Sequence, residues 1–184
     1  MTNIFESLKD YLQMNLDDEP KNPLHVGEVM SCWLYLTIIE EASIFLQTGL
    51  NMTTDDDVVK ILKESLKQCD TQGQRFKEFM IKEGIHLPPT SEQRPFSDPE
   101  AVPLGTKLTD DEIMNGVSIK TVTAIVHCAT AASQSIRNDV GSLFTHAMIE
   151  KMKFGSSLKE LMRKRGWIKV PPYYYPPGKP REYS

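Results

Sequence analysis

The sequence predicts an all-α protein, folded as a four-helix bundle, and three observations lead to that prediction. Four long segments carry apolar residues at helical spacing. A proline-rich stretch separates the second segment from the third, and two segments 82 residues apart resemble each other. The predicted organisation is one domain over residues 1–170 that begins with a short helix, followed by an extended Pro/Tyr-rich tail over 171–184.

Composition and charge limit the classes of partner. The 184 residues suit one domain, and 40% hydrophobic with 25% charged residues is ordinary for a globular protein. The net charge is −4 and no dense basic run occurs, so we expect no nucleic-acid partner. The most apolar stretch, 33–46, contains Glu40 and Glu41 and is shorter than the ~20 residues of a membrane span, so we expect no membrane association.

The cysteines and the first residues point to an intracellular protein. Cys32, Cys69 and Cys128 lie far apart without a CxxC pair, which is typical of reduced thiols in the cytoplasm. The first residues lack the basic and apolar regions of a signal peptide.

The first half of the chain predicts a helical hairpin. A short amphipathic helix over 3–14 and a linker over 17–23 precede a long helix over about 24–49. That long helix is apolar nearly all round, so a second segment or a second subunit should cover its outer face. The next helix runs over about 54–84, where Thr54 and Asp57 resemble a capping box and Gly84 provides a left-handed end.

The second half predicts another hairpin after a long connection. Residues 85–108 contain five prolines and form a crossover that runs the length of the bundle. The third helix, about 109–134, begins with the capping box of Thr109 and Glu112, and Leu108 packs on Ile113. The fourth helix, about 137–165, ends at Gly166.

An internal repeat relates the two halves. The segments FKEFMIKEGIHLPP (76–89) and LKELMRKRGWIKVPP (158–172) share Lys-Glu, Met, Lys and Gly at a constant offset of 82. We infer two similar hairpins, 24–89 and 109–172, joined by the crossover. Bundles with one long connection are of the ferritin-like kind.

Several of these segments also carry a family resemblance. GEVMSCWLYL, EGIHLPP and RGWIKVPPYY resemble a family of Bacillus-type proteins related to spore coat protein F, over residues 24–175. The resemblance implies a ferritin-like bundle and association with the spore or spore coat. It implies no established enzymatic activity and supplies no catalytic residues.

Metal binding is the chemistry to test in such a bundle. Di-iron bundles use a Glu from each of two helices and Glu-x-x-His from each of the other two. This chain has only one Glu-x-x-His, over residues 83–86, and it spans the predicted end of the second helix at Gly84, so the pair of helical motifs is missing. The candidate ligands for iron, manganese or zinc are Glu40, which lies on an apolar stripe, and the i,i+4 pair of His146 and Glu150. Alternatively, Glu40 pairs with Lys120 or another cation, and His146 and Glu150 face solvent.

The tail supplies the other functional hypothesis. Tyr173, Tyr174 and Tyr175 lie among prolines that favour an extended chain. The tail is either a strap over the bundle or a docking and tyrosine cross-linking segment. We therefore expect a non-enzymatic structural or interaction protein, with self-association or coat-type protein partners and no cofactor. The alternatives are a metal-binding bundle with a degenerate di-iron-like site, or a bundle that binds a small molecule.

Overall fold

The structure is a computed structural model that describes residues 6, 9, 21–174, 176 and 177. These residues contain four α-helices and one short 3-10 helix, and no strand. The elements are α2 (Val26–Leu50), α3 (Asp56–Lys82), η1 (Pro99–Ala101), α4 (Asp110–Gln134) and α5 (Asn138–Arg165). The all-α prediction is confirmed for this part of the chain. The expected helix at 3–14 and the tail beyond Pro177 fall outside the described residues, except for residues 6 and 9.

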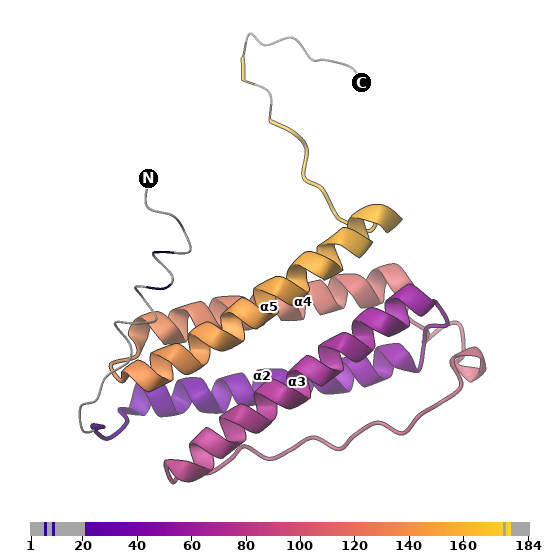
Figure 1. Cartoon of the computed structure of the whole chain (residues 1–184). Coiled ribbons are helices and arrows are strands. Elements are labelled where there is room, and N and C mark those ends of the chain that lie inside the picture. The colour runs from indigo at the N-terminus through magenta and orange to yellow at the C-terminus, as the bar shows by residue number, and fades with distance from the viewer. Residues whose placement is uncertain (1–5, 7–8, 10–20, 175, 178–184) are drawn as a thin grey trace.

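The four long helices form two antiparallel hairpins that pack on each other. Helices α2 and α3 form one hairpin and α4 and α5 form the other, as Figure 1 shows. The hairpins meet mainly through α2 and α4, and α3 and α5 touch at fewer points. We call this arrangement, residues 26–165, the helical body.

An aromatic cluster fills the middle of the helical body. The rings of Tyr35, Phe76 and Phe144 come from α2, α3 and α5 and are fully buried. The centroids of Tyr35 and Phe76 are 4.6 Å apart, and those of Phe76 and Phe144 are 5.1 Å apart. These separations are those of favourable tilted ring pairs. The Tyr35 hydroxyl donates to Gln72 Oε1 at 2.8 Å, so its polar group is satisfied inside the core.

The two hairpins end in the same way, as the repeat predicts. Gly84 and Gly166 adopt left-handed φ values of 73° and 71°. After each glycine, a backbone N–H returns to the last helical turn: Ile85 N donates to Met80 O and Trp167 N donates to Met162 O, both at 2.8 Å. This bond closes a helix with an αL residue.

Contacts between the hairpins reveal their symmetry. Lys151 contacts Cys69, and Gln68 contacts Glu150, and both pairs are 82 residues apart. Residues related by a twofold axis touch each other only where they lie on that axis. An approximate twofold axis therefore passes between α3 and α5 at this level, and the offset of 82 in the sequence is its signature.

The caps of two helices test the sequence predictions at single residues. The Thr109 hydroxyl accepts from Glu112 N and the Glu112 carboxylate accepts from Thr109 N, so the predicted capping box is confirmed. The predicted cap at Thr54 is wrong, because the Asp55 carboxylate caps α3. Thr53 is buried and its hydroxyl accepts from Asp55 N at 3.1 Å, which fixes Asp55 in the capping position.

The crossover covers part of the outer face of α2. Residues 83–109 leave α3 and return along the helical body to α4 (Figure 1). Gln47 Oε1 accepts from Arg94 N at 2.7 Å, and Asn51 Nδ2 donates to Pro95 O at 2.8 Å. The crossover is therefore the second segment that the sequence predicted to cover this helix, and it covers the C-terminal half of α2.

Helix α2 is the most apolar element of the described residues. By length and composition it meets the requirements of a membrane span, with a mean hydropathy of 1.5 over its best window. In this structure Cys32, Leu36 and Leu46 are buried in the shared core. Near its N-terminus, Val26 and Met30 remain 84% and 54% exposed.

Candidate functional site

Glu40, the first candidate metal ligand, forms an ion pair. It lies half-buried on α2, and its Oε1 is 2.8 Å from Lys77 Nζ on α3. A cation therefore neutralises this carboxylate, as one of the sequence interpretations expects, although the cation is not Lys120. The Lys120 ammonium lies over the Phe45 ring instead, 5.2 Å from its centroid.

Glu150 is also held by neighbours between the helices. Its carboxylate accepts from Gln72 Nε2 at 2.7 Å and from Arg75 NH2 at 3.1 Å. Burial alone would raise the pKa of Glu150, but the hydrogen bonds from Gln72 and Arg75 outweigh it, and the pKa lies below its usual value. The Glu150 side chain is 38% exposed, so it faces solvent only in part, whereas His146, one turn earlier, is exposed.

These positions do not converge on a metal-binding geometry. The carboxylates of Glu40 and Glu150 are each paired with a different cation, and His146 is exposed. Among the described residues, no group of three or more His, Cys, Asp or Glu side chains could hold a metal ion.

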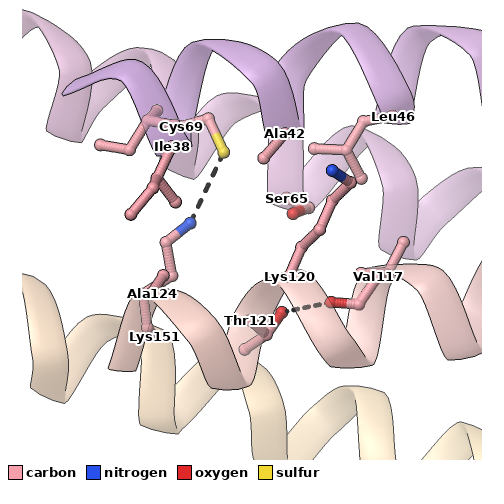
Figure 2. A pocket seen from close by; sticks show the side chains of 11 residues that line it. Ile38, Ala42, Leu46, Ser65, Cys69, Val117, Lys120, Thr121, Ala124 and Lys151 are labelled. Carbon is pink, nitrogen blue, oxygen red and sulfur yellow. Dashed lines mark hydrogen bonds between the residues drawn. The ribbon is translucent and has the colours of Figure 1, made fainter. Parts of the chain in front are cut away.

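A small cavity lies at the centre of the helical body, where the approximate twofold axis passes. Its volume is about 20 Å³. Figure 2 shows the Lys151 side chain rising from α5 toward Cys69 on α3, with 3.5 Å between Nζ and Sγ. Three other polar residues, Ser65, Lys120 and Thr121, contribute to the wall. The rest of the wall is apolar and is formed by Ile38, Ile39, Ala42, Leu46, Val117 and Ala124.

Two of the three buried thiols lack the properties of nucleophiles. Cys32, Cys69 and Cys128 are all buried and free of disulfides. Burial raises the pKa of Cys32 and of Cys128 to about 12, so both remain protonated thiols at neutral pH. Burial likewise raises the pKa of Tyr35 far above its usual value.

A polar network that the sequence did not predict closes one end of the core, where α2 and α5 begin and α3 ends. Glu28 is only 2% exposed. Its Oε1 accepts from the backbone N–H groups of Ile136 and Arg137, at 2.9 and 2.8 Å. A side chain of α2 thereby binds the start of α5, where Arg137 provides no side-chain cap of its own.

Arg137 is the centre of this network. Its guanidinium binds Glu83 at 2.7 Å and Asp139 at 2.7 Å and is 7% exposed. These hydrogen bonds hold the pKa values of Glu83 and Asp139 below their usual ranges, and the carboxylates in turn raise the pKa of Arg137. The network joins the end of α3 to the start of α5, which is a structural role.

A groove of about 500 Å³ runs between α4 and α5 on the surface of the helical body. Val122, Ile125 and Met152 give it an apolar wall, and Val122 and Met152 are 55% and 53% exposed. Ile168 and Lys169, at the start of the tail, also line it.

The tail leaves the helical body next to the groove. Trp167 and Ile168 pack against the core, but Tyr173 and Tyr174 are 77% and 82% exposed. Figure 1 shows this part of the chain leading away from the helices.

Comparison with known proteins identifies the family. Residues 13–179 match DUF3231, a family described as proteins of unknown function, and the chain belongs to it. It is 29% identical to the uncharacterized protein YvdQ of Bacillus subtilis (strain 168) over 163 residues, which are 89% of this chain and 94% of that protein.

Two solved structures resemble the fold. A candidate spore coat protein of Bacillus halodurans C-125 matches with a TM-score of 0.81 and 29% identity, over 84% of this chain and 97% of that one. A DUF305 fragment from Deinococcus radiodurans matches with a TM-score of 0.62 and 12% identity, over 78% and 99% of the two chains. The second likeness concerns the fold alone.

Proposed function

We propose that this protein is a non-enzymatic structural protein of the spore coat, and that it assembles with further copies of itself through its C-terminal tail. The observation that carries the proposal is the exposure of Tyr173 and Tyr174 on a proline-rich segment that leaves the helical body beside an apolar groove. The spore coat as the location rests on the likeness to the candidate coat protein of Bacillus halodurans.

The helical body in this proposal is a ferritin-like four-helix bundle that serves as a scaffold. One long connection joins two hairpins of the same design, which is the connectivity of ferritin-like bundles. At the centre of its core, Lys151 Nζ lies 3.5 Å from Cys69 Sγ. The carboxylates of Glu40 and Glu150 are occupied by Lys77 and Arg75, which favours a structural role.

The groove between α4 and α5 is the proposed receptor for the tail of a second copy. It begins at Ile168 and Lys169, where each chain's own tail turns away from it. Val122 and Met152 would be buried by an extended segment lying along the groove. A proline-rich segment is already extended before binding, so it loses little conformational entropy when it docks. Tyrosine rings supply large apolar contact with a polar tip.

The proposal is tested by measuring molar mass in solution across a range of concentrations, using size-exclusion chromatography with light scattering. The full chain should self-associate, and deletion of residues 173–184 should leave a monomer. Met152→Glu, in the groove wall, should also abolish association. Ile81→Glu on α3 is the matched control, because Ile81 is equally accessible (63% exposed) but lies far from the tail in sequence and on another helix.

Each outcome has a definite meaning. Association of the deletion variant at the same concentrations as the full chain would refute the role of the tail. If Met152→Glu still associates and only the deletion of residues 173–184 abolishes association, the groove is refuted as the receptor. Circular dichroism melts of all variants should match the full chain.

The location is tested in cells. A fluorescent fusion expressed in sporulating Bacillus subtilis should form a ring around the developing spore, and the deletion variant should be diffuse. A diffuse signal from the full chain would reject the coat assignment.

A further inference from the structure

The ammonium of Lys151 is the most unusual group in the core. Lys151 is 5% exposed, and its Nζ makes one contact among the described residues, with Cys69 Sγ at 3.5 Å. None of the described carboxylates forms an ion pair with it. An ammonium has three N–H donors, whereas a thiol sulfur is a weak acceptor. A buried charge without a counter-charge is costly, so this site calls for an anionic partner.

A second buried donor lies on the same cavity. Ser65 is 4% exposed and lines the cavity from α3. Its hydroxyl has no hydrogen-bond partner among the described residues, whereas the Thr121 hydroxyl donates to Val117 O at 2.8 Å. Two unsatisfied donors, an ammonium and a hydroxyl, therefore border one small space.

The charge and size of the cavity define what it holds. Lys151 and Lys120 both contribute to its wall, and no carboxylate does, so the local charge is positive. Figure 2 shows the two lysine side chains reaching into the layer between the hairpins. The volume is about 20 Å³, and one water-sized occupant needs about 10–15 Å³. A monatomic anion fits, whereas sulfate, phosphate and carboxylates are too large.

We propose that the cavity is a halide site, occupied in solution by chloride. The Lys151 ammonium supplies the counter-charge and the first hydrogen bond, and Ser65 donates the second. The Cys69 side chain, 3.5 Å from Lys151 Nζ, completes the polar wall. The cavity is lined by residues of all four helices, so a bound anion joins the two hairpins from within their shared core. This inference is independent of the proposed role in the spore coat.

The direct test is crystallographic. Crystals of the full chain grown in sodium bromide are measured at the bromine absorption edge. An anomalous peak is expected in the cavity, within hydrogen-bonding distance of Lys151 Nζ and Ser65 Oγ. A cavity without anomalous signal, whether empty or filled by water, would overturn the proposal.

A solution titration separates specific binding from occupancy at crystal concentrations. Protein prepared in sodium gluconate is titrated with chloride or bromide at constant ionic strength while Tm is measured. A saturating rise of about 5–10 °C is expected at hundredfold excess over Kd, because the halide binds only the folded state. Lys151→Met should abolish the rise, and Ser65→Ala should weaken the halide affinity about tenfold.

The controls make the result decisive. Lys159→Met removes an exposed lysine from the same helix and should keep the full response. Equal responses in Lys151→Met and the unmodified chain would reduce the effect to a general salt effect and reject the site. If Lys151→Met fails to fold, the Ser65→Ala titration and the bromide crystals still decide the question.

Discussion

Glu28 offers the sharpest test of how the helical body is held together. The carboxylate is buried and accepts from Ile136 N at 2.9 Å and Arg137 N at 2.8 Å, across 108 and 109 residues of chain. Glu28→Ala would leave both N–H groups without this acceptor, and the Arg137 N–H is buried. Hydrogen bonds to a charged group each contribute about 1.5–3 kcal/mol, so we expect a loss of about 3–6 kcal/mol for the pair.

The measurement is equilibrium unfolding in urea and by heat, followed by circular dichroism. A loss of about 3–6 kcal/mol corresponds to a fall in Tm of about 6–24 °C for a chain of this length. Glu28→Gln should cost less, about 1–2 kcal/mol, because the amide oxygen still accepts one hydrogen bond.

Glu112 is the matched control, because it occupies the same capping-box position at the start of α4. Its carboxylate is exposed and bonds only within its own turn, to Thr109 N at 2.8 Å. Glu112→Ala should therefore cost only about 0.5–1 kcal/mol. Equal losses in the two variants would show that the bonds from Glu28 to α5 add nothing beyond helix capping, and would refute the reasoning.

Three further predictions concern pH, packing and metals. Arg137 depresses the pKa of Asp139. The stability that this ion pair contributes is therefore present above the unfolded pKa of about 3.9 and is lost as pH falls below it. Arg137→Met should flatten this loss in acid unfolding curves. Gly116→Ala should cost about 1–3 kcal/mol in urea unfolding, because the new Cβ would lie 2.4 Å from Phe45 Cζ. Purified protein loaded anaerobically with iron, manganese or zinc should bind no stoichiometric metal by mass spectrometry, and Glu40→Ala should leave the metal content unchanged.

Each of these has its own counter-evidence. Gly155→Ala is the packing control, since its Cβ would lie an ordinary 3.6 Å from Thr121 Cγ2, and equal costs for the two glycines would contradict the clash. An unchanged acid transition in Arg137→Met would show that other carboxylates govern acid unfolding. A stoichiometric metal that is lost on Glu40→Ala would overturn the structural proposal and restore the metal hypothesis.

Local signals in the sequence predicted the ends of the elements well. Gly84 and Gly166 end α3 and α5 in the left-handed conformation, and the Thr109 capping box begins α4. Each depends on a few neighbouring residues, so the sequence contains all the information that fixes it. The offset of 82 predicted two similar hairpins, and in the structure residues 82 apart touch each other where the hairpins meet.

The long-range contacts could not be predicted in this way. Glu28 lies in the first turn of α2, where the positive end of the helix dipole favours an acidic side chain. This local explanation is sufficient, so nothing in the sequence pointed to its partners more than a hundred residues away. Glu150 lies beside polar residues in sequence, but a neighbouring helix supplies Gln72 and Arg75.

Lys151 is a different kind of omission, because its signal was present. Ala147, Lys151, Phe154 and Leu158 follow one another at spacings of four, three and four, which places the lysine on the buried stripe of α5. This pattern would have identified the buried lysine from the sequence alone.

The near-symmetry of the two hairpins has a consequence for what the chain can place at its centre. In a dimer of identical hairpins, every residue on the axis would face its own copy, so lysine would oppose lysine and cysteine would oppose cysteine. Fusing the hairpins into one polypeptide removes that constraint, because each half can mutate alone. Cys69 and Lys151 occupy equivalent positions but differ in charge and chemistry. The crossover is thus more than a connection, since it allows an asymmetric pair to exist where symmetry would permit only identical ones.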